Sequence, residues 1–330
     1  MTVISVDLAY KDYRSIGIAV LEPRAEGIDC EFATVPLTGE PRVQPLADYL
    51  VDLADGRRAG CLIIDGPQGW KHPVHEHCGT RQCERSLNTQ GKTGLPGQAK
   101  PGSWLGFFQF SVDLFEELTR NGWELYAGNQ SAIPPRLALE SYPYAAWRGL
   151  ELLPLPSKRR ATHADIDARA RTLSRGYEIA MSRDPNHDEL QALVAGLGAV
   201  ALQRETNDFT AAGAPPERVD GVWREGFIIS PVRHPHLPEL LLEGSESEPP
   251  VTPPRRPRPR RASRTTTPGY VNRNDQQVVR PTGLPGTDHG SWTYELRCRR
   301  CDYRYGSNGT DNWQRKCPRC QGGAPGNPLS

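Results

Sequence analysis

The chain has 330 residues, with 40 Lys and Arg against 39 Asp and Glu, so its net charge at pH 7 is +1. This length fits one sizeable domain plus a smaller one, at roughly 100 to 200 residues per domain, and the near-neutral charge means that any basic surface must be local. There is no run of about 18 apolar residues and no signal-peptide pattern. We therefore expect a cytoplasmic protein without a membrane partner, and its oligomeric state is left open.

The first 65 residues predict a meander of three strands, then a helix and a fourth strand. Three short, apolar or β-branched segments are separated by polar turns, which is typical of consecutive strands. Leu46, Leu50 and Leu53 then repeat at the spacing of a helix. Residues 61–65 return as a buried strand that would pair in parallel across this helix. The meander segments are residues 3–9, 16–21 and 28–36.

Further helices and one more strand are predicted up to about residue 201. Apolar side chains repeat at helical spacing near residues 108–121, 166–181 and 190–201. Residues 136–142 have the pattern of a strand. The order β-β-β-α-β-α-β-α predicts an α/β fold, in which helices flank a mixed sheet made of a three-strand meander plus parallel strands.

Four acidic side chains stand where a predicted strand ends or a predicted helix begins. A carboxylate in such an apolar setting is costly unless it is neutralised, and a cluster of carboxylates usually surrounds a cation. Mg2+ and Mn2+ prefer oxygen ligands, and a pair of such ions promotes phosphodiester hydrolysis by activating water and stabilising the leaving oxygen. The predicted catalytic residues are Asp7, Asp65, Glu140 and Asp188.

Each of these carboxylates has a predicted role and a simpler alternative. Asp7, in the central strand, would bridge the metal ions, or it lies at a sheet edge facing water. Asp65 would be a metal ligand at the C-terminal end of a parallel strand, or it starts a turn. Asp188 would be a ligand from the last helix, or it only interacts with the helix dipole. Glu140 would complete the site, or it holds a neighbouring loop.

A polar insertion between residues 71 and 104 predicts a flap that faces the substrate, with a solvated loop as the alternative. Arg81, Arg85 and Lys92 are placed to meet phosphates. The tripeptide GKT at residues 91–93 is not a P-loop, because Ser86 stands where the upstream glycine is required. A zinc site is the lesser alternative, since the spacing of the donors matches no regular finger. Those donors are His72, His75, His77, Cys78 and Cys83.

Residues 237–290 are rich in Pro and Arg and have little to bury, so we predict a disordered linker. Its run of arginines would follow a phosphate backbone, or it is only solvated. A flexible link would raise the local concentration of the catalytic domain, residues 1–236, around whatever the C-terminal module grips. The arginines of the run are Arg255, Arg256, Arg258, Arg260, Arg261 and Arg264.

Residues 291–330 predict a zinc ribbon. The spacing C-x2-C-x15-C-x2-C fits one tetrahedral, structural Zn2+, which would supply most of the folding energy of so small a module. Its ligands are Cys298, Cys301, Cys317 and Cys320. Nearby cationic and aromatic side chains predict a surface for DNA or RNA; the alternatives are a scant aromatic core with solubilising arginines, or a protein partner. The predicted nucleic-acid contacts are Arg299, Arg300, Arg304, Trp313 and Arg315.

Six motifs follow one another between residues 3 and 232: VDLAY, IIDGPQG, RQCERSL, LESYPYAAW, HDELQALVAG and EGFIISP. Their order resembles that of the family called domain of unknown function 429, whose members are predicted RNase H-like nucleases. The resemblance implies an RNase H-like fold and a nuclease activity without naming a substrate. Resolvase-like relatives often carry a second Asp three residues after the acid that opens the last helix, where this chain has Gln191.

The sequence therefore predicts a metal-dependent nuclease of RNase H-like fold, tethered to a zinc ribbon that binds nucleic acid. One alternative is a non-catalytic nucleic-acid-binding scaffold of the same fold, motivated by Gln191. Another is a phosphate-ester or nucleotide enzyme of this fold, although the chain has no glycine-rich phosphate turn after Asp7.

Overall fold

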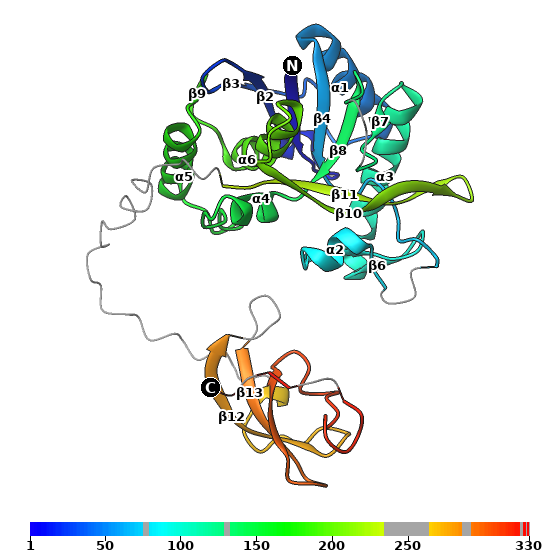
Figure 1. Ribbon diagram of the computed structural model, residues 1–330, viewed down its shortest axis with the longest axis vertical. Helices are drawn as coiled ribbons and strands as arrows, with labels where there is room; N and C mark the ends of the chain where they lie inside the picture. Colours follow the sequence, from blue (N-terminus) through cyan, green and yellow to red (C-terminus); the bar gives the residue numbers. More distant parts are fainter. Residues whose placement is uncertain are drawn as a thin grey trace. The chain divides into compact units, whose positions relative to one another are not determined.

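The computed structural model describes residues 1–74, 79–128, 133–233, 264–285, 292–323, 326–327 and 329 (Figure 1). The chain divides into two compact units, Met1–Glu246 and Ser247–Ser330. Within the described ranges, no helix is long and apolar enough to cross a membrane. His75, His77 and Cys78, which belong to the alternative zinc set, lie outside these ranges.

The N-terminal unit is a mixed α/β structure built on one sheet, whose main path has the order β10-β11-β8-β4-β1-β2-β3-β9, with β7 paired to β8. The strands are β1 (Thr2–Asp7), β2 (Gly17–Pro23), β3 (Ile28–Ala33), β4 (Ala59–Asp65), β7 (Glu124–Leu125), β8 (Leu137–Ser141), β9 (Ile179–Met181), β10 (Phe209–Val219) and β11 (Val222–Pro231). The helices are α1 (Val43–Arg57), α2 (Gln82–Ser86), α3 (Leu105–Arg120), α4 (Pro143–Gly149), α5 (His163–Gly176) and α6 (His187–Gln203).

Smaller elements complete this unit. The 3-10 helices η1 (Tyr13–Ser15) and η2 (Gly102–Trp104) precede β2 and α3. A short hairpin of β5 (Lys92–Thr93) and β6 (Ala99–Lys100) lies within the polar insertion. The insertion is thus folded over much of its length rather than merely solvated.

The predicted meander and parallel strands are confirmed. β1, β2 and β3 pair antiparallel in sequence order, and β4 pairs in parallel with both β1 and β8. The helix predicted through Met181 is wrong at its end, because α5 stops at Gly176 and Glu178 has φ 52°. Residues Ile179–Met181 then pair in parallel with β3 as an edge strand.

Two hydrophobic cores lie on the two faces of the sheet (Figure 1). On one face α6 packs against β1, β2 and β11, with α4 and α5 beside it. On the other face α1 and α3 cover the central strands. α6 is apolar on almost every side and is buried along most of its length, as expected for a central helix.

The C-terminal unit contains a three-stranded antiparallel sheet of β12 (Gln276–Pro285), β13 (Trp292–Cys298) and β14 (Arg304–Asn308). The linker predicted over residues 237–290 is therefore wrong in its second half, where η3 (Arg264–Thr266) and β12 are folded. β12 is ordered because Val278 and Gln276 are buried against the neighbouring strand, at 1% and 0% exposure. Residues 237–263 lie outside the described ranges.

Candidate metal centres

The sheet register brings Asp7 and Asp65 together. Val6 is the partner of Ile64 in the parallel pair β1–β4, so the two acids that follow end adjacent strands. In a strand successive side chains point to opposite faces. Asp7 and Asp65 are each an even number of residues from strand side chains that pack against α6, so both acids point to that face of the sheet. The two predicted ligands are thus neighbours on one face, at the C-terminal edge of parallel strands where α/β sheets place their sites.

The first turn of α6, which carries Asp188, passes close to this edge of the sheet. Asn186 caps this helix by accepting hydrogen bonds from the backbone N–H groups of Asp188 and Glu189, at 2.9 and 3.0 Å. Gly17 lies opposite Asp7 in the sheet, and a Cβ at Gly17 would come within 2.2 Å of the Asp188 carbonyl carbon. A glycine is needed there for the helix to approach the sheet so closely.

Burial and neighbouring negative charges disfavour ionisation of both Asp7 and Asp65. Burial raises the pKa of Asp7 well above its usual value, and the charges of Asp65 and Asp188 raise it further. Burial, with the charge of Glu140, raises the pKa of Asp65 to about 7. A hydrogen bond joins the Asp7 and Asp65 carboxyl groups. Without a cation, this site therefore favours the neutral form of a carboxyl group more than water does.

Lys158 is a cation beside the acidic cluster of Asp7, Asp65 and Asp188. Its ammonium group pairs with Asp188, whose other carboxylate oxygen lies 3.1 Å from Nδ1 of His187. Burial alone would raise the pKa of Asp188, but the hydrogen bonds with His187 and Lys158 lower it below its usual value. The Lys158 side chain is 57% exposed, so it lies at the rim of the cluster.

Glu140 does not join the acidic cluster as predicted. It is the register partner of Ile64 on β4, which places it on the opposite face of the sheet from Asp65. Both of its oxygens accept hydrogen bonds from the Arg81 guanidinium, at 2.6 and 2.7 Å, and one also accepts from the backbone N–H of Gln68 at 3.0 Å. Glu140 is the anion of a buried ion pair, which agrees with the alternative that it holds a neighbouring loop, and its catalytic role remains a prediction.

The prediction that Arg81 contacts phosphates is wrong, because this side chain is only 1% exposed and does not face solvent. Besides Glu140 it contacts Glu84 at 3.0 Å and donates to the Thr93 hydroxyl at 2.8 Å. Lys92 is half-buried and donates to the Glu84 backbone oxygen at 2.7 Å. Arg81 and Lys92 thus stabilise the fold of the insertion, whereas Arg85 lies at the surface.

Replacing Arg81 with Ala should lower the free energy of unfolding of the N-terminal unit by about 3–5 kcal/mol, since it leaves two buried carboxylates without their cation. Arg85→Ala, an exposed change on the same short helix, should alter it by less than about 0.5 kcal/mol. Urea unfolding followed by tryptophan fluorescence measures both values. Equal stabilities for the two variants would show that the buried pair does not support the fold.

Ser141, beside Asp65, could not be identified as a site residue from the sequence pattern. Ser141 ends β8 opposite Asp65 in the register, is 2% exposed, and its hydroxyl has no hydrogen-bond partner among the described residues. Gln191, which stands where resolvase-like proteins often have Asp, accepts a hydrogen bond from the indole N–H of Trp147 at 2.7 Å. A buried hydroxyl without a partner is costly, so Ser141 is a candidate contact for a ligand.

The pocket beside Asp65 has a volume of about 130 Å3. We call it the aromatic pocket, since Trp104, Phe107, Phe108 and Tyr142 line it together with Asp65. Its polar lining includes the buried Arg81–Glu84–Glu140 network.

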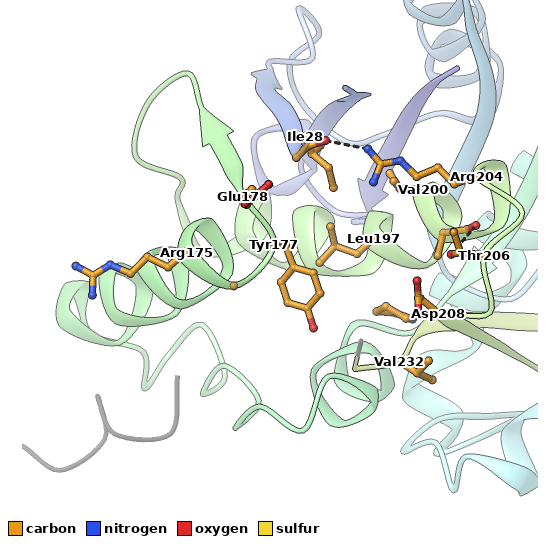
Figure 2. Close-up of a pocket in the computed structure, with 14 residues that line it drawn as sticks. Ile28, Arg175, Tyr177, Glu178, Leu197, Val200, Arg204, Thr206, Asp208 and Val232 are labelled. Carbon is orange, nitrogen blue, oxygen red and sulfur yellow. Dashed lines mark hydrogen bonds between the residues drawn. The ribbon is translucent and has the colours of Figure 1, made fainter. Parts of the chain in front are cut away.

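A larger pocket of about 430 Å3 lies between the ends of α5 and α6, and Figure 2 shows its lining. None of the four predicted catalytic acids lines it. Arg204 reaches from the end of α6 to the backbone oxygens of Arg24 and Gly27, at 2.8 and 2.9 Å. The Tyr177 hydroxyl is buried without a hydrogen-bond partner among the described residues. The lining mixes acidic, basic and apolar groups and indicates no particular ligand.

In the C-terminal unit the four predicted cysteines come together and are able to hold a metal ion, with all four sulfurs within 4.8 Å of one another. The Cys298–Cys320 and Cys301–Cys317 sulfur distances are both 3.6 Å. Zn–S bonds of about 2.3 Å in a tetrahedron place sulfurs about 3.8 Å apart. The geometry therefore fits a closed thiolate site.

Groups behind the cysteines orient them. Burial would favour the Cys298 thiol, but N–H groups of Arg300 and Cys301 and the Gln276 amide lower its pKa to about 6. Gln276 donates to the Cys298 sulfur at 3.6 Å and accepts from the Tyr305 hydroxyl at 3.0 Å. Such outer contacts are typical of metal sites whose ligands are held in place.

The predicted nucleic-acid contacts of this unit differ in their exposure and in the side chains that they contact. Arg299 is exposed, and Trp313 is 46% exposed with the Arg273 guanidinium 5.2 Å from its ring centroid. Arg300 pairs with Asp275 at 2.9 Å, and Arg304 pairs with Glu295 at 3.0 Å. Arg315 lies 5.9 Å from the centroid of the Tyr305 ring. The Arg300–Asp275 pair is exposed and therefore weak, whereas the Glu295 carboxylate that pairs with Arg304 is buried.

Comparison with protein-family models, curated proteins and solved structures gave no match to this chain. Its function is therefore argued from the geometry of the two sites.

Proposed function

We propose that the chain is a metal-dependent nuclease that hydrolyses phosphodiester bonds of nucleic acid. Its N-terminal unit is then a catalytic domain of RNase H-like fold, as in the domain of unknown function 429 family. The three-strand meander β3-β2-β1, continued by the parallel strands β4 and β8 with helices on both faces, supports this assignment.

The observation that carries the proposal is the juxtaposition of Asp7 and Asp65, with Asp188 close enough to raise the pKa of Asp7. Carboxylates so close together stabilise the fold only if a cation neutralises them. The donor set is all oxygen, which suits Mg2+ or Mn2+. The Ser141 hydroxyl beside Asp65, for which the described part of the chain offers no hydrogen-bond partner, adds a further oxygen at the same edge.

Each residue has a distinct part in the proposed reaction. Asp7, between the other two acids, would be the shared metal ligand, and Asp65 and Asp188 would complete the set. Bound Mg2+ or Mn2+ would activate a water molecule and stabilise the leaving oxygen. Lys158 lies at the rim and would exchange Asp188 for a substrate phosphate as metal binds.

The C-terminal unit would be a zinc ribbon, with Zn2+ held by Cys298, Cys301, Cys317 and Cys320. Thiolate ligands in a closed tetrahedral set are typical of structural zinc. The cationic and aromatic side chains on this unit would bind the phosphates and bases of the substrate, with a protein partner as the competing use of the same surface.

The test is cleavage of a labelled panel of single-stranded DNA, duplex DNA, RNA, hybrid and four-way junction by the zinc-loaded full chain. We expect cutting of at least one substrate with Mn2+ or Mg2+ and none by the Asp7→Asn variant. Cleavage that persists in the variant would locate the nuclease elsewhere, and no cleavage by the wild type would contradict the proposal.

Replacing Lys158 with Met should tighten Mn2+ binding about threefold to fivefold, because it removes the cation that competes for Asp188. The effect is modest because an exposed ion pair contributes up to about 1 kcal/mol. Arg159→Met removes the same charge from the next residue and should leave the affinity unchanged. Titration calorimetry of both variants decides this, and equal affinities would show that Lys158 does not compete with the metal.

A non-catalytic scaffold that binds nucleic acid is the second candidate. Two observations favour it: Lys158 already pairs with Asp188, and Gln191 is hydrogen-bonded to Trp147 instead of offering a carboxylate. Filter binding of the same panel without Mg2+ or Mn2+ tests it. Tight binding that is unchanged by Asp7→Asn, with no cleavage under any condition, would select the scaffold.

A further inference from the structure

The size and position of the aromatic pocket limit what it holds. Its volume of about 130 Å3 is well below the roughly 300 Å3 at which pockets for whole small-molecule ligands begin. A single planar ring fits, and the rest of the ligand must lie outside. Because Asp65 lines the pocket, that outer part would lie next to the acidic cluster.

A continuous series of aromatic rings connects the pocket to the cluster. Tyr10, three residues after Asp7, lies 6.1 Å from Phe107 between ring centroids. Phe107 lies 5.9 Å from Phe108, and Phe108 lies 5.9 Å from Trp104. These separations are those of mutually supporting aromatic pairs. The three ring pairs are tilted or edge-on, so a flat π-system that enters the pocket would add one more ring to an existing aromatic cluster.

The surrounding residues keep the pocket open and rigid. A Cβ at Gly91 would come within 2.4 Å of the Trp104 ring and 2.6 Å of the Phe108 ring, so the loop must pass the rings with glycine. Behind the rings, Arg81 is held between Glu84 and Glu140. The pocket is thus formed before any ligand arrives, which reduces the cost of binding.

We propose that the aromatic pocket binds one unpaired base of the nucleic acid and so holds the adjoining phosphate at Asp7 and Asp65. This inference rests on the proposed nuclease function and narrows its substrate to single-stranded or locally unpaired nucleic acid. A base in a duplex reaches such a pocket only by leaving its stack, which costs a few kcal/mol. Stacking on aromatic rings accepts every base, so we expect little sequence preference.

The test uses a short abasic strand that carries a single 2-aminopurine base, made in DNA and RNA forms, and an otherwise identical strand without the base. The zinc-loaded full chain binds both without Mg2+ or Mn2+. We expect the base to strengthen binding by roughly 5- to 100-fold and its fluorescence to be quenched on binding. In Trp104→Leu the gain should fall to less than about twofold, whereas Phe110→Leu, on the following helix α3 but outside the pocket, should keep it.

The two strands carry the same phosphates, so the comparison isolates the base. Tyr142→Leu is the second variant if Trp104→Leu proves unfolded by its melting curve. A gain that is the same in wild type, Trp104→Leu and Tyr142→Leu, or no gain in either strand form, would overturn the pocket assignment. Because no catalysis is measured, these results stand apart from the cleavage panel: the pocket fails if the base has no effect in a chain that cuts, and the nuclease fails if Mn2+ gives no cutting.

Discussion

The Asp7→Asn variant should lose metal-dependent cleavage by at least roughly 100-fold while its metal-free form becomes more stable. Asp7 would be the shared metal ligand, and removing a group that stabilises charge in a transition state costs this much or more. We expect lower activity together with higher stability only if Asp7 serves the activity and destabilises the metal-free fold.

The gain in stability follows from the raised pKa of Asp7. Because the folded-state pKa lies above the unfolded value of about 3.9, the carboxyl destabilises the fold increasingly as pH rises from about 4 towards the folded-state value. Asparagine removes this penalty and should raise the melting temperature by a few degrees.

Thermal melting at pH 7 without divalent ions measures the effect, and Asp52→Asn on the exposed side of α1 is the matched control. We expect no change in melting temperature or cleavage for the control. An Asp7→Asn variant that melts below the wild type would show that Asp7 supports the fold, and retained activity would remove it from the catalytic set.

Loss of zinc should unfold the C-terminal unit and leave the N-terminal unit folded. Structural zinc contributes about 10–16 kcal/mol of binding free energy in small domains, and this unit has one short three-stranded sheet to stabilise it otherwise. Cys317→Ser should therefore bind less than stoichiometric zinc. Its C-terminal unit should be digested rapidly by protease, whereas the wild type should hold one zinc ion per chain and resist.

Cys30→Ala is the control, since it removes a buried thiol from the N-terminal unit and should keep the full zinc content. Zinc content by mass spectrometry and the size of the protease-resistant fragment give the readouts. A Cys317→Ser chain with one zinc ion and an intact C-terminal unit would contradict the four-cysteine site.

The features that sequence predicts well here are local or periodic. Alternation and helical spacing located the meander, β4, β8, α3 and α6 to within a few residues, and the paired CxxC spacing located all four sulfurs of the cysteine cluster. The β10–β11 hairpin was missed, although its turn at Asp220-Gly221, with φ 54° and 75°, has the sequence signal of a two-residue hairpin loop.

The partners of charged residues could not be predicted in the same way. Glu140 and Ser141 are adjacent in sequence, but strand alternation puts Ser141 beside Asp65 and turns Glu140 to the other face. Arg81 and Glu140 are 59 residues apart in the sequence. The local sequence therefore cannot show that they form a buried ion pair instead of a phosphate contact at Arg81 and a metal ligand at Glu140. Fold register decides between these roles, and it is a property of the whole sheet.

The proposed nuclease function depends above all on whether the carboxylates bind a divalent cation. Electron paramagnetic resonance of Mn2+ titrated into the zinc-loaded full chain measures this directly, with wild type, Asp7→Asn and Asp52→Asn compared. We predict at least one bound Mn2+ per chain in the wild type and in Asp52→Asn, and its loss in Asp7→Asn. The same Mn2+ binding in all three proteins, or none in the wild type, would contradict a metal centre at Asp7, Asp65 and Asp188.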